Sequence, residues 1–172
     1  DQVSDPTNTQ AVKAWVDSQY VPAVTWTDIA WLRGIWQGKL VIKGILEADD
    51  ARAALDAGAD GVVISNHGGR QLDSVASTIS KLPAVIEAVG GRLEVFMDGG
   101  VRGGMDVFKA VALGATGVMI GRPWAWAIAG RGEAGLVDLL ATFKRELAVA
   151  MALTGARSIS EVHRDLIEWD RC

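Results

Sequence analysis

The chain has 172 residues, of which 49% are hydrophobic and 22% are charged, and its 17 basic and 21 acidic side chains give a formal net charge of −4. This acidic balance provides no basic face, which argues against nucleic acid as a partner. The one cysteine is Cys172, so an internal disulfide and a thiol-cluster metal site are excluded. We therefore expect one soluble cytoplasmic domain.

The first part of the chain, residues 1–24, differs in composition from the remainder. Residues 1–9 are polar and include Pro6, which is typical of a mobile loop or a cut end. An apolar stripe then follows at roughly helical spacing. It consists of Val12, Trp15, Val16 and Tyr20. We assign residues 1–24 to a loop segment and residues 25–172 to an α/β unit.

The α/β unit is expected to begin with a helix whose N-cap is Thr27 and whose inner face carries Ile29, Leu32 and Trp36. From residue 40 onward, short apolar runs alternate with helical patterns. The expected strands are 40–45, 61–66, 94–98 and 117–121, and the expected helices are 49–57, 78–89, 105–113 and 133–153. This alternation predicts a parallel sheet covered by helices.

An internal repeat supports this prediction. Residues 58–65 (GADGVVIS) resemble residues 114–121 (GATGVMIG), 56 positions further along the chain. A unit of two strands and two helices therefore occurs twice. Four strands are half of an eight-stranded (β/α)8 TIM barrel, which usually takes ~250 residues. The predicted fold is a half-barrel, and an open four-stranded α/β sheet is the alternative.

Polar residues follow the ends of the predicted strands, where the loops of an α/β barrel gather at one face. Asp98-Gly-Gly-Val-Arg102 ends the third strand, and Gly121-Arg122-Pro123 ends the fourth. Glycines let the backbone approach an anion closely, and helix N-termini favour negative charge. These paired loops predict a phosphate site, and two ordinary turns with solvated arginines are the alternative.

Three further side chains are candidates for chemistry. Lys43 lies in an apolar run, where an ammonium needs an anionic partner, either a cofactor or a structural carboxylate. His67 ends the second strand and Arg70 follows it after two glycines. An imidazole can accept a proton and a guanidinium can grip a carboxylate, although a lone histidine is more often structural. His163 lies in a charged tail and is expected at the surface.

The stretch SNHGGRQLD at residues 65–73, together with VIKG at 41–44, DGGVR at 98–102 and GRP at 121–123, closely resembles the FMN-dependent 2-hydroxy acid dehydrogenase and oxidase family. Other phosphate-binding barrels share the glycine–arginine loop but lack the histidine motif. The resemblance implies an FMN enzyme that oxidises a small (S)-2-hydroxy acid, of the lactate, glycolate or mandelate type, to the 2-oxo acid.

The resemblance also implies roles for individual residues. His67 would take the proton of the substrate hydroxyl, and Arg70 would bind the substrate carboxylate. Lys43 would stabilise the reduced flavin, and Ser65 would contact FMN. Asp98 would hold the ribityl hydroxyls. The phosphate would be held by Gly99, Gly100, Arg102, Gly121 and Arg122.

Two departures from the family pattern matter. Gly103 stands where the family often has a second basic residue, and the substrate and flavin contacts of the family's N-terminal half are not found in this sequence. The expected partners are therefore the N-terminal half of the same barrel and, as in the family, further copies in a homo-oligomer of the tetramer type. A non-catalytic half-barrel and a different FMN or phosphate-binding barrel are the alternatives. A peripheral position on the inner face of the cell membrane is the alternative location, and the electron acceptor is left open.

Overall fold

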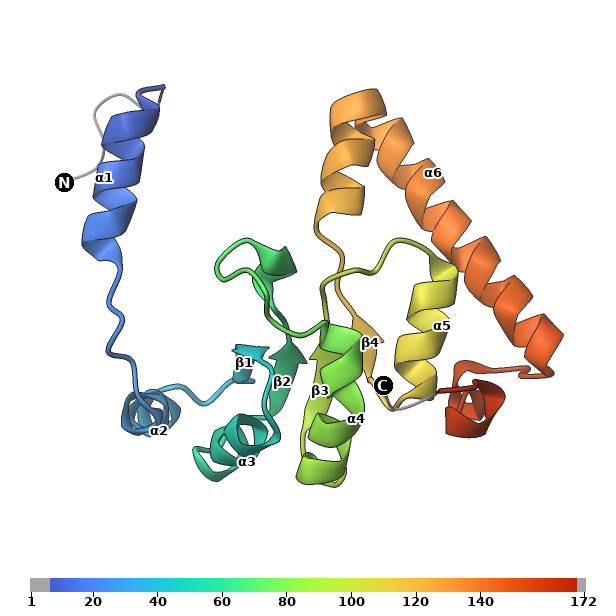
Figure 1. The fold of residues 1–172 in the computed structure, drawn as a ribbon, viewed down its shortest axis with the longest axis horizontal. Coiled ribbons are helices and arrows are strands. Elements are labelled where there is room, and N and C mark those ends of the chain that lie inside the picture. The colour runs from blue at the N-terminus through green and yellow to red at the C-terminus, as the bar shows by residue number, and fades with distance from the viewer. Residues whose placement is uncertain (1–6, 170–172) are drawn as a thin grey trace.

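The computed structural model describes residues 7–169, so Cys172 and residues 1–6 of the expected N-terminal loop segment lie outside the described residues. Its elements follow in chain order (Figure 1). They are α1 (Thr9–Gln19), α2 (Trp26–Ile35), β1 (Val41–Ile45), α3 (Ala48–Asp56), β2 (Gly61–Ile64), the 3-10 helix η1 (His67–Gly69), α4 (Thr78–Val89), β3 (Glu94–Met97), α5 (Gly104–Ala112), β4 (Gly117–Val118), α6 (Arg122–Thr154), and the 3-10 helices η2 (Ile159–Glu161) and η3 (Arg164–Leu166).

The four strands form one parallel sheet in the order β1-β2-β3-β4, which confirms the predicted parallel α/β fold. One face of the sheet packs against helices through a continuous apolar core. Val62, Ile64 and Val95 of the sheet join Leu82 and Val85 of α4 in that core, and each is at most 2% exposed. Burial of the apolar strand residues against the helices is what holds the two layers together.

The opposite face of the sheet carries the alternate side chains. Lys43, Val63 and Phe96 lie in one register row across β1, β2 and β3, and none of them belongs to the core beneath the helices. Successive strand residues point to opposite faces, so this row faces away from the helices. Among the described residues, β1 and β4 each pair on one side only, which leaves two sheet edges open.

The internal repeat predicted from the sequence is present in the backbone. Helices α3 and α5 end at equivalent positions, and each is followed by a glycine with positive φ, Gly58 at +86° and Gly114 at +103°. In both turns the amide of the following alanine donates to a helix carbonyl at 3.0 Å, from Ala59 to Ala54 and from Ala115 to Ala110. Glycine is required at these turns because a Cβ is strained at such φ values.

The beginning of the sheet is anchored by Asp60. Its carboxylate accepts hydrogen bonds from the Lys39 ammonium at 2.8 Å, the Leu40 amide at 2.9 Å and the Arg33 guanidinium at 3.1 Å. These bonds, first that from Lys39, hold the pKa of Asp60 below its usual value. They join α2 to the start of β1, the strand that carries Lys43.

Two predicted helix boundaries were wrong. Helix α2 is capped by Thr25 and not by Thr27, since the Thr25 amide and hydroxyl both donate to the Asp28 carboxylate at 2.7 Å, and these bonds lower the pKa of Asp28. Trp36, expected on the inner face of this helix, is 53% exposed. The final helix begins at Arg122 and not at residue 133.

The early start of α6 has a local cause. Proline is well tolerated in the first turn of a helix, and Pro123 occupies that position. The helix breaks at Arg131 and Gly132, where Gly132 adopts a φ of +60°. The predicted start at residue 133 therefore coincides with the second segment of a kinked helix.

Helix α1 lies within the segment expected to be a loop, and Asn8 caps its first turn. Figure 1 shows it standing apart from the sheet. The assignment of residues 1–24 as a separate segment stays a prediction. Within residues 7–169, no helix combines the length and the apolar composition needed to span a bilayer.

Candidate functional site

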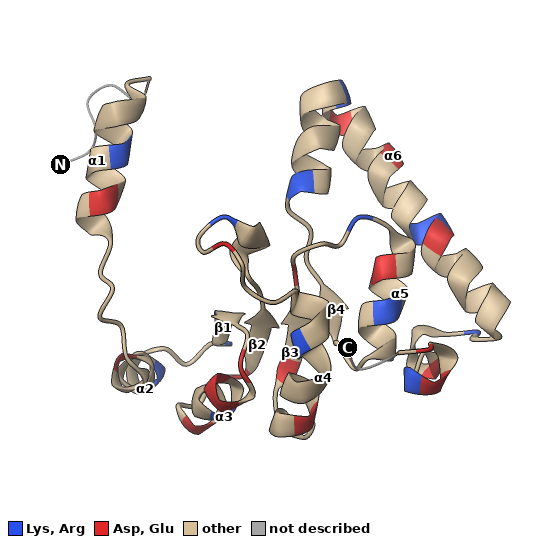
Figure 2. Ribbon diagram, in the orientation of Figure 1, with Lys and Arg blue, Asp and Glu red and all other residues tan. Residues whose placement is uncertain are grey.

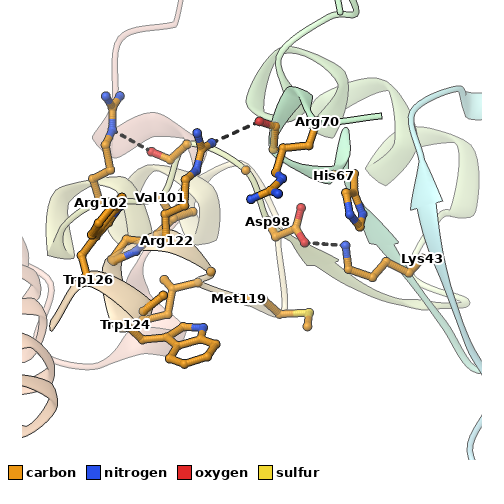
Figure 3. A pocket seen from close by; sticks show the side chains of 17 residues that line it. Lys43, His67, Arg70, Asp98, Val101, Arg102, Met119, Arg122, Trp124 and Trp126 are labelled. Carbon is orange, nitrogen blue, oxygen red and sulfur yellow. Dashed lines mark hydrogen bonds and ion pairs between the residues drawn. The ribbon is translucent and has the colours of Figure 1, made fainter. Parts of the chain in front are cut away.

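A cavity of about 940 Å³ opens at the carboxyl ends of the strands (Figure 3). Its size lies within the range of small-molecule and cofactor sites. All of the site residues predicted from the sequence line it except Ser65. They are Lys43, His67, Arg70, Asp98, Gly99, Gly100, Arg102, Gly121 and Arg122. Parallel strands bring their carboxyl ends to one edge, which is why residues far apart in the sequence meet here.

Lys43 and Asp98 form an ion pair across the sheet. The Lys43 Nζ lies 2.6 Å from Asp98 Oδ2 and 2.7 Å from the Ser65 hydroxyl. Ser65 is only 2% exposed and is not among the cavity residues. Lys43 therefore has a carboxylate partner within the chain, which is one of the two partners that the sequence left open. Its side chain also lines the cavity, so it can contact a cofactor there as well.

The second carboxylate oxygen of Asp98 has a different environment. Asp98 Oδ1 is buried and has no hydrogen-bond partner among the described residues. A buried carboxylate oxygen without a donor is costly, so a ligand that brings a hydroxyl or an N–H to this point would be favoured.

The histidine loop starts directly after β2. The His67 amide donates to the Ser65 hydroxyl at 3.1 Å, and the Gly68 amide donates to Asn66 Oδ1 at 3.0 Å. His67 has a φ of +54°, an uncommon value for a residue with a Cβ. In Figure 3 the side chains of His67, Arg70, Lys43 and Asp98 gather on one side of the cavity.

The arginines of the predicted phosphate loops lie on the other side. Arg122 Nη2 donates to the Gly68 carbonyl at 3.2 Å, and Arg102 Nε donates to the Gly100 carbonyl at 3.1 Å. Figure 2 shows basic residues on the loops at this end of the sheet. Arg70, Arg102 and Arg122 all line the cavity, so its surroundings favour an anion.

The helix that follows Arg102 contributes less to such a site than the sequence predicted. The Arg102 amide donates to Asp106 at 2.8 Å, and the Gly104 amide donates to Glu146 at 2.7 Å. A Cβ at Gly103 would lie 2.5 Å from Glu146 Oε2, so a side chain at this position would displace that carboxylate. These two amides already have anionic partners and so are not free to bind a phosphate.

Sequence reasoning missed an apolar wall of the cavity. Met119, Trp124 and Trp126 line it opposite His67 and Arg70 (Figure 3). Both tryptophans lie in the first turns of α6, a stretch for which the sequence predicted no helix. The pattern Trp-Ala-Trp directly after Gly121-Arg122-Pro123 was the available signal. His163 is half-exposed and is not among the cavity residues, in keeping with its predicted surface position.

Comparison with known proteins identifies the family. The model of a family described as FMN-dependent dehydrogenase matches residues 2–169. The chain is 52% identical over 158 residues to an L-lactate dehydrogenase of Caulobacter vibrioides. This match covers 92% of this chain and 41% of that protein. A crystal structure of mandelate oxidase with (S)-4-hydroxymandelic acid matches with a TM-score of 0.84 and 44% identity, over 90% of this chain and 43% of that one.

A second mandelate oxidase structure, of a variant with an FMN adduct, matches with a TM-score of 0.78 and 46% identity, over 82% of this chain and 45% of that one. The chain thus spans less than half the length of these relatives, and its four strands and their helices match part of a TIM-barrel flavoenzyme. The chain belongs to the FMN-dependent dehydrogenase family.

Proposed function

We propose that this chain forms the half of a (β/α)8 barrel that holds FMN and accepts the proton in the oxidation of a small (S)-2-hydroxy acid to its 2-oxo acid. The observation that carries the proposal is the meeting of His67, Arg70 and the Lys43–Asp98 pair at one cavity. The lactate and mandelate activities named for the relatives indicate the substrate class.

The cavity residues fit FMN. The unpartnered Asp98 Oδ1 is an acceptor suited to a ribityl hydroxyl. A Cβ at Gly100 would meet no atom within 4 Å, so the backbone there is open to close approach by a ligand. Arginine side chains bind phosphate with paired hydrogen bonds. The residues that would hold the cofactor are Lys43, Ser65, Asp98, Gly99, Gly100, Arg102, Gly121 and Arg122.

The proposed reaction divides the work among three side chains. Arg70 grips the substrate carboxylate with two hydrogen bonds and so orients the α-carbon. His67 takes the proton of the substrate hydroxyl at an imidazole nitrogen, which allows the C–O bond to become a carbonyl. Lys43 brings a positive charge to the cavity and would stabilise the negative charge of the reduced flavin. Bound FMN supplies the acceptor for the α-hydrogen and its electron pair.

Replacement of the histidine tests this proposal. In the FMN-loaded protein assembled with the N-terminal half of the barrel, we expect His67→Ala to keep its flavin and to slow anaerobic flavin reduction by L-lactate or (S)-mandelate by about 10²–10⁴-fold, because the general base is lost. His163→Ala is the matched control and is expected to leave the rate unchanged, since His163 lies outside the cavity. A His67→Ala rate within threefold of the wild type would rule out the assigned role.

A second candidate function rests on the open sheet edges. The chain covers 41% of the length of the L-lactate dehydrogenase it matches, and β1 and β4 each lack a second neighbour among the described residues. We infer that catalysis needs the remaining strands of the barrel, and that without them the chain is a phosphate-binding half-barrel that does not turn over substrate. The cytoplasmic location and the homo-oligomer stay predictions.

A further inference from the structure

We propose that Asn66 is a positioning residue, whose side-chain oxygen holds the backbone at His67 and Gly68 in the conformation that brings the imidazole to the cavity. The role assigned to His67 rests on the proposed function. The role assigned to Asn66 rests on the geometry of the loop, which can be measured without turnover.

The backbone after β2 adopts an uncommon conformation. His67, Gly68 and Gly69 have φ values of +54°, +68° and +73°. Two of these residues are glycines, for which such values carry no steric cost, but His67 has a Cβ and adopts them less readily. Contacts around the loop must therefore hold His67 in this conformation.

Asn66 makes these contacts at both ends of the loop. Its Oδ1 accepts the Gly68 amide at 3.0 Å, the bond that caps η1. Its Nδ2 donates to the Ala76 carbonyl at 3.4 Å. An asparagine that accepts the amide two residues further on mimics a backbone turn. One side chain thus closes the loop that carries both His67 and Arg70.

The same side chain also contacts the neighbouring strand end. A Cβ at Gly99 would lie 2.9 Å from Asn66 Oδ1, so Asn66 packs directly against the backbone that follows Asp98. The Gly99 carbonyl in turn accepts the Thr78 hydroxyl at 3.1 Å. Asn66 therefore sets the position of the histidine loop against the strand end that carries Asp98.

Asn66 can be changed without removing a cavity residue. It does not line the cavity, and its side chain bonds to backbone atoms of Gly68 and Ala76. Ser65 also accepts the His67 amide, but it contacts Lys43 as well, so its replacement would disturb two groups at once. Asn66 is the residue at which the conformation of the loop can be tested separately.

The kinetic test uses the FMN-loaded protein assembled with the N-terminal half of the barrel, and compares Asn66→Ala, Asn66→Ser and Asn8→Ala with the wild type. We expect Asn66→Ala to slow flavin reduction at saturating substrate by about tenfold or more with flavin content unchanged, because a misplaced base loses its alignment. Asn66→Ser is expected to recover the rate to within about threefold, since a serine hydroxyl can accept the same amide. Asn8→Ala removes an equivalent bond, to the Ala11 amide, outside the site and is expected to have no effect.

Hydrogen exchange at the Gly68 amide is the second readout. It is expected to speed up by about tenfold or more in Asn66→Ala and to return toward the wild-type rate in Asn66→Ser, because a lost bond exposes the amide. An unchanged exchange rate in Asn66→Ala, or an Asn66→Ser variant as slow in catalysis as Asn66→Ala, would overturn the proposal. If Asn66→Ala loses its fold or its flavin, Asn66→Ser alone must preserve the rate and the Gly68 protection.

The two proposals can fail separately. A wild-type protein that is assembled with the N-terminal half of the barrel and binds FMN, but is not reduced by any 2-hydroxy acid, would refute the proposed function, while exchange at Gly68 would still decide the role of Asn66. A His67→Ala variant that is inactive beside an Asn66→Ala variant at wild-type rate would leave the proposed function standing and refute the role of Asn66.

Discussion

The two carboxylate oxygens of Asp98 have different surroundings. One carboxylate oxygen accepts from Lys43 at 2.6 Å, and the other is buried without a partner among the described residues. The side chain of Asp98 is 18% exposed, so water reaches it poorly. A carboxylate offers two acceptor oxygens, which allows it to hold the lysine and a ligand hydroxyl at the same time.

Replacing Asp98 by asparagine leaves one acceptor oxygen for two donors. We expect Asp98→Asn to weaken FMN binding by roughly tenfold to a hundredfold, since a hydrogen bond involving a charged group contributes ~1.5–3 kcal/mol. Flavin fluorescence titration measures this affinity. Asp138→Asn, which removes an exposed ion pair with Arg131, is the matched control and should bind FMN as the wild type does. Equal affinities for Asp98→Asn and Asp138→Asn would contradict the role of Asp98.

At the scale of elements, the contact between α5 and α6 sets the position of the Asp98–Arg102 loop. Glu146 of α6 accepts the amide of Gly104 at the first turn of α5, and the two helices approach closely there. A Cβ at Gly104 would lie 2.2 Å from the Phe143 carbonyl oxygen and 2.3 Å from the Leu147 nitrogen. Both neighbours are backbone atoms of α6, so they cannot turn aside as a side chain would.

We expect Gly104→Ala to lower the free energy of unfolding by about 1–3 kcal/mol or more, because the helices must separate to admit the methyl group. Gly34→Ala in α2 is the matched control, since its Cβ would meet nothing within 4 Å. It should be neutral or stabilising by up to ~1 kcal/mol, as alanine favours a helix over glycine. Urea denaturation of both variants measures the difference, and equal stabilities would show that α5 and α6 pack less tightly than the structure indicates.

Within residues 7–169, the sheet has two open edges, because β1 and β4 each lack a second neighbouring strand. Val41 in β1 is 43% exposed, and Met119, directly after β4, is 44% exposed. An edge strand with free backbone groups pairs readily with another chain. The missing neighbours are consistent with a chain that spans less than half of its relatives' length.

We therefore expect the isolated 172-residue chain to associate or aggregate at micromolar concentration and to lack turnover with L-lactate and added FMN. Sedimentation velocity gives the size, and species heavier than the 18.2 kDa monomer are the expected result. A monodisperse monomer that oxidises L-lactate would refute both the inferred need for further strands and the half-barrel interpretation.

Much of the fold could be predicted because the signals are local. An apolar run of strand length, a helical stripe and a glycine at a helix end each act within a few residues, so the strands from 61 and 94 and the helix 78–89 were placed correctly. The repeat of residues 58–65 at 114–121 predicted a repeated unit of two strands and two helices for the same reason. The start of α6 was missed, because the sequence predicted a helix only from residue 133, whereas the helix begins at Arg122 and continues through a kink at Arg131 and Gly132.

The residues that gather at the carboxyl ends of the strands could be identified from the amino-acid order alone, since parallel topology directs every strand end to one edge. Their pairing could not be identified in this way. The Lys43–Asp98 ion pair, the bond from Arg122 to the Gly68 carbonyl and the contact of Asn66 with Gly99 join residues that lie more than 30 positions apart. Such pairings depend on the register of the strands and the path of each loop in three dimensions, and no short window of sequence contains both partners.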